Sequence, residues 1–190
     1  ALGPAAKQCC GGHVRLAFTV YSEASQPNSE QPFMVFVYGK GHVGQALEKA
    51  CSDLPIRLTF VDHRPGYAAD LLDYKQAIAQ ASNQDAHIVM THDHGLDLDI
   101  CAALLAAGPW AYLGLIGSKT KKARFDSQLR ARDLDPSPII CPIGIPGIEG
   151  KEPAVIAAAV AAELLIVRSV QAKTSKPNAI SRPNASVRTE

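Results

Sequence analysis

The stretch FMVFVYGKGHVGQALEKACSDLPIRLTFVD, residues 33–62, decides the fold. An apolar run leads directly into a G-x-G-x-x-G pattern, which consists of Gly39, Gly41 and Gly44. Apolar residues then recur at helical spacing over residues 43–54, and a second apolar run ends on Asp62. The order of strand, glycine turn, helix, strand and acid predicts a nucleotide-binding βαβ unit.

Each glycine of this unit has an expected role. Gly39 allows the tight turn, Gly41 lets backbone N–H groups approach a pyrophosphate, and Gly44 lets the helix pack close to the strand. The helix N-terminus then faces the phosphates with unpaired N–H donors, and Asp62 is placed to accept hydrogen bonds from a ribose. A glycine turn that serves only packing is the alternative, and the pattern does not establish hydride transfer.

Apolar runs alternate with helical patterns along the rest of the chain. Strands are predicted at residues 86–90, 110–116 and 139–143, and Pro142 makes the last of them an edge or irregular strand. Helices are predicted at residues 69–81, after His94, at 119–132 and at 153–168. This alternation predicts an α/β fold, a Rossmann-like doubly wound, mostly parallel sheet with helices on both faces.

Composition divides the chain into four predicted segments. Residues 33–170 form the Rossmann-like domain, and the polar, proline-bearing residues 22–32 form a linker. Residues 1–21 are interpreted as the end of a mostly missing N-terminal domain, because they are too short to bury a core and begin without Met. Residues 171–190 lack periodicity and are predicted to be a disordered tail.

Charge and cysteine content narrow the function class. Hydrophobic residues make up 47% of the chain, charged residues 19%, and the net charge is +1. A balanced charge argues against a general nucleic-acid or membrane-surface binder. No signal peptide opens the chain, and no apolar run reaches the roughly 18 residues of a membrane span, so a cytoplasmic location is expected. An odd count of five cysteines indicates reduced thiols.

Polar residues follow each predicted strand and, because carboxyl ends of parallel strands meet at one edge, are expected to converge in one crevice. These residues are Lys40 and His42; Asp62, His63 and Arg64; Thr91, His92, Asp93 and His94; and Gly117, Ser118, Lys119 and Thr120.

Two of these clusters have competing interpretations. His92 and His94 could ligate a metal with Asp93 and Asp97, or act as a general acid or base; alternatively, an aspartate merely caps the helix. Residues 117–132 carry six positive charges against one negative, which predicts a second phosphate cradle at residues 117–120 or simply a solvated helix face.

The cysteines fall into two groups. Cys9 and Cys10 lie next to two glycines and are candidates for thiolate chemistry or soft-metal contact, against an ordinary turn with incidental thiols. Cys51 and Cys101 occupy apolar helix positions and are predicted to be small core residues, while Cys141 is undecided.

Taken together, five stretches over residues 1–168 resemble the xanthine dehydrogenase accessory proteins, the XdhC/CoxI group. They are Leu2-Gly3-Pro4 with Gln8-Cys9-Cys10-Gly11-Gly12, residues 39–44, Thr91-His92-Asp93-His94 with Leu96-Asp97, Leu115-Ile116-Gly117-Ser118 with Lys122 and Phe125, and residues 141–144 through 150–154. Five motifs in order are far more specific than the glycine loop alone.

The resemblance implies a non-catalytic maturation factor. Such a factor binds molybdenum cofactor, in mono- or dinucleotide form, while a cysteine desulfurase supplies its sulfido ligand. It then passes the cofactor to a xanthine dehydrogenase or related molybdenum hydroxylase; pairing of the factor with itself is left open. Its cofactor contacts here would be Gly39, Gly41, His42, Gly44, Asp62, His92, His94, Gly117, Ser118 and Lys119, with Cys9 and Cys10 contacting molybdenum or sulfur.

Two other functions remain open from the residues themselves. An NAD(P)-dependent oxidoreductase would use Asp62 for a free ribose hydroxyl or Arg64 for a 2′-phosphate. A nucleotide-sensing module would use the same fold without chemistry. The chain shows no separate substrate domain, which counts against the oxidoreductase.

Overall fold

The computed structural model describes residues 32–62 and 73–174 of the 190-residue chain. The predictions for Cys9, Cys10, His63 and Arg64, for the N-terminal remnant and for most of the linker and tail therefore lie outside the described residues.

The described chain forms one parallel sheet with helices on both sides. The strands are β1 (Phe33–Tyr38), β2 (Ile56–Val61), β3 (Ala86–Val89), β4 (Tyr112–Leu115) and β5 (Ile139–Ile140), in the order β2-β1-β3-β4-β5. The helices are α1 (His42–Ala50), α2 (Tyr74–Gln80), α3 (His94–Ala107), α4 (Lys119–Arg130) and α5 (Pro153–Thr174). Every strand pair is parallel, and the predicted Rossmann-like α/β fold is confirmed.

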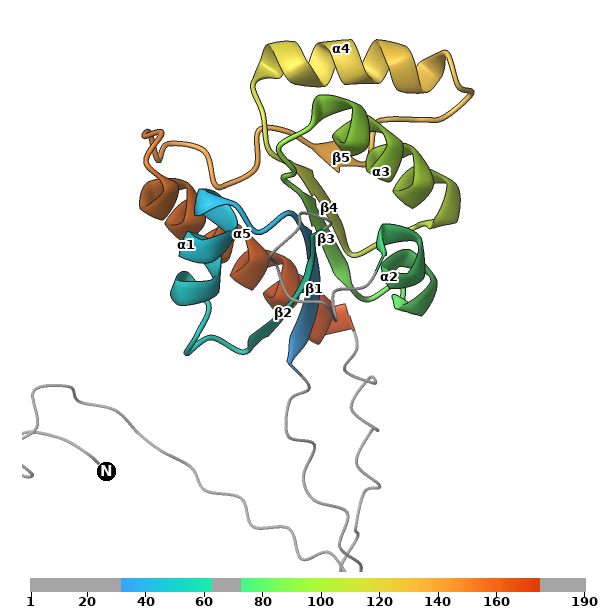
Figure 1. Ribbon diagram of the computed structural model, residues 1–190. Coiled ribbons are helices and arrows are strands. Elements are labelled where there is room, and N and C mark those ends of the chain that lie inside the picture. The colour runs from blue at the N-terminus through green and yellow to red at the C-terminus, as the bar shows by residue number, and fades with distance from the viewer. Residues whose placement is uncertain (1–31, 63–72, 175–190) are drawn as a thin grey trace, which may run out of the picture. The chain divides into compact units, whose positions relative to one another are not determined.

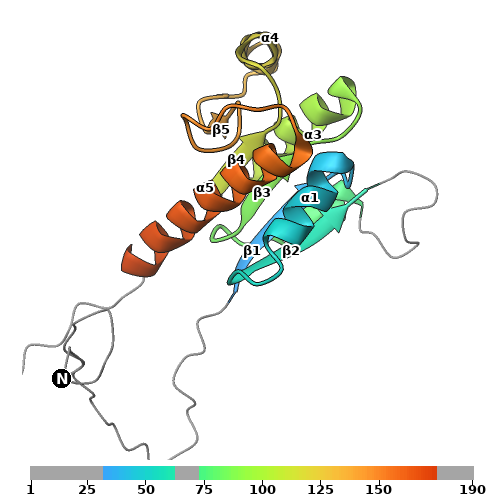
Figure 2. The same ribbon diagram turned by 90° about the vertical axis from the view of Figure 1, so that its left-hand side faces the viewer.

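The order of the strands explains which helix covers which face. The chain moves from β1 to β2 in one direction and then crosses back to β3, β4 and β5 in the other. Because parallel crossovers are right-handed, α1 lies on one face of the sheet and α2, α3 and α4 on the opposite face (Figure 1). After β5 the chain returns to the first face, where α5 runs beside α1 (Figure 2).

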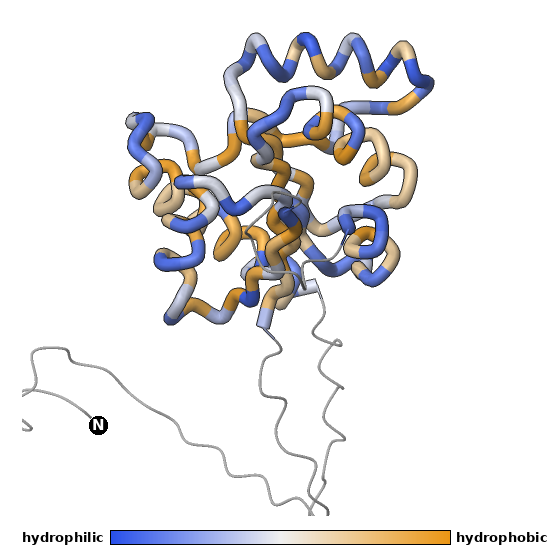
Figure 3. Tube along the Cα trace, viewed as in Figure 1, coloured by the Kyte–Doolittle hydropathy of each residue, from blue (hydrophilic) through white to orange (hydrophobic). Residues whose placement is uncertain are grey.

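Two cores lie on the two sides of the central strand β1. Val35 and Val37 point toward α1 and α5, where Leu47 and Leu164 are fully buried. Phe36 and Tyr38 point the other way, toward the helices α2 and α3. A strand buried on both faces needs apolar residues without alternation, and the hydrophobic centre of Figure 3 follows these strands.

The position of β1 also fixes where a ligand can bind. The chain leaves β1 on one side toward β2 and comes back on its other side as β3, so strand order reverses between β1 and β3. The helices that follow these two strands lie on opposite faces, which leaves a crevice at the carboxyl ends of β1 and β3.

Three predicted boundaries differ from the structure. β5 has two residues instead of the predicted five, because Pro142 has no N–H to continue the ladder. In the described part of the predicted helix 69–81, α2 begins at Tyr74, behind a capping box in which Asp73 accepts from Lys75 N. α5 continues to Thr174, past the predicted start of a disordered tail at residue 171.

By length and composition, α5 is the one described helix that meets the criteria for a membrane span. Two charges, Glu163 and Arg168, interrupt its apolar residues, so no uninterrupted run was apparent in the sequence. One such helix is weak evidence for a membrane protein, because helices of water-exposed domains pass the same test. In this fold Ala157, Val160 and Leu164 pack one side of α5 into the core.

Candidate functional site

The glycine loop between β1 and α1 is held by close packing at two of its three glycines. Gly39 has φ +108°, and a Cβ there would lie 2.6 Å from the carbonyl oxygen of Met90. A Cβ at Gly44 would lie 2.9 Å from the carbonyl oxygen of Gly39. Both positions exclude a side chain, so the expected roles in the tight turn and in helix–strand packing are confirmed.

Gly41 is different, because a Cβ built on it meets nothing within 4 Å. It is the N-cap of α1 and supplies no capping side chain; the first intrahelical bond runs from Gln45 N to Gly41 O. The N–H groups of His42, Val43 and Gly44 precede that bond and have no intrahelical partner. Space beside exposed N–H donors at a helix start is the geometry that suits an anion.

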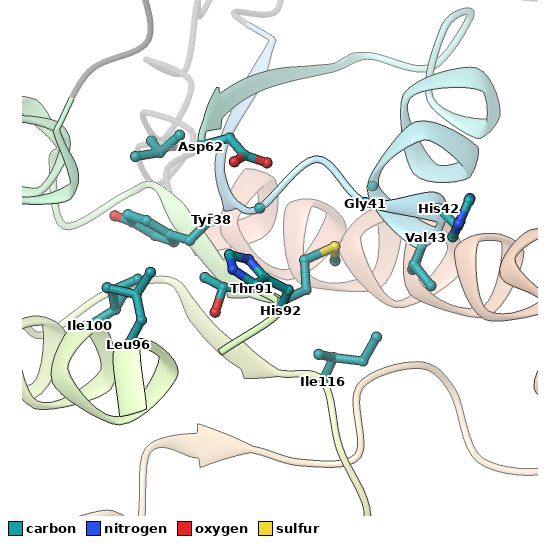
Figure 4. A pocket seen from close by; sticks show the side chains of 14 residues that line it. Tyr38, Gly41, His42, Val43, Asp62, Thr91, His92, Leu96, Ile100 and Ile116 are labelled. Carbon is teal, nitrogen blue, oxygen red and sulfur yellow. The ribbon is translucent and has the colours of Figure 1, made fainter. Parts of the chain in front are cut away.

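The glycine loop opens onto a cavity of about 260 Å³. It lies at the carboxyl ends of β1, β2 and β3, at the point where strand order reverses. Figure 4 shows Asp62 and Ile116 on opposite sides of this cavity, with His92 between them. Of the predicted cofactor contacts, this cavity brings together Gly39, Gly41, His42, Gly44, Asp62 and His92.

Asp62 is buried at the end of β2 and holds the glycine loop in place. Its Oδ2 accepts a hydrogen bond of 2.7 Å from the backbone N–H of Lys40. The Lys40 ammonium turns away, to Glu48 Oε1 at 2.7 Å and over the ring of Phe60.

The segment after β3 divides into a cavity-lining part and a capping part. Thr91 and His92 line the cavity. Asp93 is the N-cap of α3 and accepts from Gly95 N at 2.6 Å and Leu96 N at 3.0 Å, and these backbone bonds lower the pKa of its carboxyl. The capping interpretation is therefore correct for Asp93.

A buried ion pair that the sequence analysis did not predict lies beneath the cavity. Asp97 is fully buried; its Oδ1 accepts from the backbone and hydroxyl of Thr91, at 3.0 and 2.7 Å. Its Oδ2 lies 2.6 Å from Lys121 Nζ, which also donates to the Ile116 carbonyl at 2.9 Å. The pair thus joins the ends of β3 and β4. In the sequence, Asp97 occupies an otherwise apolar position of α3. A charged residue at such a position was the feature that could have indicated a buried ion pair.

The carboxylates of Asp93 and Asp97 are therefore already engaged, one in a helix cap and the other in an ion pair. The predicted metal site loses two of its four candidate ligands. His94 Nδ1 accepts from Arg124 Nη2 at 3.0 Å, outside the cavity of the glycine loop. Within the described residues, no group of three His, Cys, Asp or Glu side chains is arranged to hold a metal ion.

The predicted single crevice is wrong for the segment after β4. Gly117 and Lys119 line a second cavity of about 500 Å³, formed with the loop that follows β5 and the start of α5. Ser118 lines neither cavity, because its side chain caps α4 by accepting from Lys121 N. Ile116 lines both cavities, so the two hollows meet at the end of β4.

Gly117 lies in close contact with the side chain of Lys121. A Cβ on it would lie 2.5 Å from Cδ of Lys121, whose side chain passes over the glycine toward Asp97. Gly117 thus leaves room for the Lys121 side chain, and its role as a cofactor contact stays a prediction.

Half of the basic residues between positions 119 and 132 form ion pairs. Lys121 is paired with Asp97, Lys122 with Asp126, and Arg132 just beyond the helix with Asp99. Phe125 and Leu129 are buried, as the solvated-face interpretation requires. Three of the six basic side chains of this segment are therefore engaged in ion pairs, which reduces its positive charge.

The described cysteines carry neutral thiols. Burial raises the pKa of Cys51 to about 11 and that of Cys101 to about 12, and both side chains belong to the core, as predicted. Burial also raises the pKa of the half-buried Cys141, whose Sγ lies 3.8 Å from the carbonyl oxygen of Ser118. None of the three has the lowered pKa of a reactive thiolate.

A second buried polar residue, His87, lies behind the cavity in the middle of β3. Its Nδ1 is 2.9 Å from the hydroxyl of Tyr38, and its ring stacks on Phe36 and meets Trp110 edge-on. Burial lowers the pKa of His87 to about 4, so the ring is neutral at pH 7. In the sequence this residue was apparent only as part of an apolar strand.

Comparison with known protein families identifies the family to which this chain belongs. The model of the XdhC Rossmann domain matches residues 35–164, which include the glycine loop and the loops of both cavities. The chain belongs to the XdhC Rossmann domain family. The resemblance to this family that the motifs indicated is therefore confirmed.

A solved structure supports the same fold. A crystal structure of a xanthine dehydrogenase from Bacillus halodurans matches this XdhC domain with a TM-score of 0.64 and 22% identity, over 76% of this chain and 45% of that one. The chain thus spans less than half the length of that protein. A comparison with curated proteins found no match.

Proposed function

We propose that this XdhC Rossmann domain binds molybdenum cofactor through its phosphate groups. It does so as part of an accessory factor that supports sulfuration of the cofactor and its insertion into a xanthine dehydrogenase or a related molybdenum hydroxylase. The family match and the xanthine dehydrogenase name of the solved relative support this class of partner. A cysteine desulfurase is the expected sulfur source.

The observation that carries the proposal is the open space at Gly41. The helix begins with unpaired N–H groups beside a cavity, and no neighbouring atom would clash with a side chain at Gly41. Together these features form an anion cradle that a Cβ at Gly41 would partly fill. Molybdenum cofactor carries a phosphate, or a pyrophosphate in its dinucleotide form, and either group fits such a cradle.

Binding rather than covalent chemistry suits the residues around the cradle. The hydroxyl of Thr91 donates to Asp97, and the hydroxyl of Tyr38 is bonded to the ring of His87. Burial also raises the pKa of Tyr38 well above its ordinary value of 10. The two hydroxyls in the described lining are therefore engaged, which favours a carrier over an enzyme that attacks its ligand.

The test is retention of molybdenum by the full chain. The protein is incubated with cofactor released from a molybdenum hydroxylase and separated by gel filtration, and bound molybdenum is measured by metal analysis. Gly41→Val should reduce retention on the order of tenfold, because its side chain occupies the space of the phosphate. Ala50→Val, at the exposed far end of the same helix, is the matched control.

Parallel samples with NAD(H) and NADP(H) separate the alternative functions. Retained molybdenum that depends on Gly41 supports the carrier. Tight NAD(P) binding with turnover of a small alcohol or acid favours an oxidoreductase, and binding without turnover favours a sensor. Equal molybdenum retention by wild type and Gly41→Val contradicts the proposed role of the glycine loop.

Cys9 and Cys10, which lie outside the described residues, enter the proposal as candidate contacts to molybdenum or its sulfido ligand. Loading of Cys9→Ser and Cys10→Ser measured in the same assay should fall for at least one variant. Unchanged loading of both would remove the thiols from the mechanism.

A further inference from the structure

The second cavity, beside the end of β4, has no part in the proposed function. It measures about 500 Å³ and is bounded by the loop between β5 and α5, drawn in orange in Figure 1, and by the first turns of α5. Pockets that enclose a drug-sized organic molecule measure roughly 300–1,000 Å³. The cavity is therefore large enough to hold a ligand of its own.

The wall of the second cavity is held in place by its own hydrogen bonds. Glu163 of α5 accepts at Oε2 from the backbone N–H of Gly144, at 2.6 Å, and from the hydroxyl of Tyr112, at 2.7 Å. Ile145 N donates to the carbonyl of Ala159 at 3.4 Å. Gly144 has φ +98°, and a Cβ there would lie 3.0 Å from Cβ of Ala159, so a glycine suits this close approach of the loop to α5. The cavity is thus preformed, as ligand pockets usually are.

Aliphatic side chains form fixed parts of this wall. Ile116, Ile143 and Ile156 are each partly exposed, and each packs against the core on the α5 side of the sheet. Because the core already restrains these side chains, a ligand that covers them pays little for ordering them. They provide apolar surface for the body of a ligand.

Lys119 adds a positive charge to the same cavity. It is the one charged side chain among the described lining residues. Lys121 and Lys122, in the same turn of α4, are paired with Asp97 and Asp126. For Nζ of Lys119, by contrast, the described part of the chain contains no ion-pair or hydrogen-bond partner. The cavity therefore combines a cation without a partner and apolar surface.

This combination indicates the chemical class of the ligand. A bare inorganic anion would pair with the lysine but leave the isoleucines in water, and a neutral hydrocarbon would cover the isoleucines but give the ammonium group no anion. A ring that carries a carboxylate or a phosphate serves both. A rigid ring also loses less conformational freedom on binding than a flexible chain does.

We propose that the second cavity binds a small organic anion with an aromatic or heteroaromatic ring, separately from the ligand of the glycine loop. The anionic group lies at Lys119, and the ring lies against Ile143 and Ile156. Lys119, one of the predicted cofactor contacts, serves this second ligand instead. The site does not depend on molybdenum cofactor, because none of these three residues lines the cavity of the glycine loop.

Two pairs of compounds test the charge requirement, each an anionic ring with its neutral counterpart. The pairs are pterin-6-carboxylate with pterin, and indole-3-carboxylate with indole. Binding to the full chain is measured by equilibrium dialysis. Lys119→Met removes the ammonium group and keeps an apolar side chain of similar length. Lys49→Met makes the same change near the exposed end of α1, outside both cavities, and is the matched control.

A second pair of variants tests the position of the ligand. Ile148 lines the second cavity and is 45% exposed, so Ile148→Glu places a negative charge at the cavity without disturbing the core. Ile166→Glu makes the same change at an exposed isoleucine of α5 outside both cavities.

We expect at least one anionic ring to bind wild type, Lys49→Met and Ile166→Glu equally. The same compound should bind Lys119→Met and Ile148→Glu on the order of tenfold more weakly. Its neutral counterpart should bind more weakly than the anion, and equally to wild type and Lys119→Met. Gly41→Val should bind the anionic ring as wild type does.

Two results would overturn the second site: equal binding of the anionic ring to wild type and Lys119→Met, or binding of neither anionic ring to wild type. Both leave the proposed function standing, since its test is the loss of retained molybdenum in Gly41→Val. Conversely, a chain that retains no molybdenum but binds an anionic ring in a manner that depends on Lys119 has the second site without the carrier function.

Discussion

Lys121 Nζ lies 2.6 Å from Asp97 Oδ2, and this buried contact fixes the ends of two strands at the candidate site. The Asp97 side chain is fully buried, and that of Lys121 is 9% exposed. Since Asp97 also holds Thr91 and Lys121 holds the carbonyl of Ile116, the pair positions one wall residue of the first cavity and the residue shared by both cavities.

Removing one member of this pair should be costly. Lys121→Met leaves the Asp97 carboxylate buried without its cation, and we expect a loss of about 3–5 kcal/mol in the free energy of unfolding. Lys121→Met combined with Asp97→Leu should recover much of that loss, because no unpaired charge remains. Urea unfolding followed by circular dichroism measures both variants.

The exposed pair between Arg132 and Asp99 is the control for this experiment. Asp99→Ala should change stability by less than about 1 kcal/mol, because solvent screens the interaction. A loss of similar size for Lys121→Met would show that burial of the Asp97–Lys121 pair has no energetic consequence.

Gly39→Ala should destabilise the fold, in contrast to Gly41→Ala. The methyl group added at position 39 would meet the carbonyl of Met90 in a backbone conformation with φ +108°, which we expect to cost about 1–3 kcal/mol for the backbone alone. Gly41→Ala faces open space and should unfold at nearly the wild-type urea concentration. Equal midpoints for the two variants in urea would contradict this assignment of roles.

Glu163→Ala should loosen the loop after β5. Its removal leaves the Tyr112 hydroxyl, at a residue only 3% exposed, without its acceptor, which should cost about 1–3 kcal/mol. Tyr112→Phe should cost less, because no buried donor is left unpaired. Hydrogen exchange provides a local measurement: the Gly144 amide should exchange faster in Glu163→Ala and remain unchanged in Tyr112→Phe.

Acid should weaken the fold through His87 over a defined pH range. Burial lowers the pKa of His87 to about 4, whereas the unfolded chain has the ordinary value of 6.5. Its contribution to stability is complete above pH 6.5, falls as pH decreases toward 4 because only the unfolded state takes up the proton, and is constant below that. A shift of this size corresponds to about 3 kcal/mol.

His87→Phe removes this titration, so its unfolding free energy should decline less than that of wild type between pH 6.5 and 4. His92→Ala removes an exposed imidazole instead and should decline as wild type does. Parallel curves for wild type and His87→Phe, measured by urea unfolding at several pH values, would exclude His87 as the source.

The sequence by itself determined the fold, the glycine loop and the family. Apolar runs, glycine spacing and helix caps act over a few residues, so the roles of Gly39 and Gly44 and the cap at Asp93 could be assigned from their neighbours in the chain. Only the tertiary structure decided which strand ends share a cavity. Lys121 and Asp97, or Tyr112 and Glu163, are far apart in sequence, and whether a lysine points into solvent or across Gly117 depends on the packing of separate elements. For that reason the sequence could not show that the Lys121 side chain crosses Gly117 to reach Asp97, or that Gly117 and Lys119 line a second cavity beside that of the glycine loop.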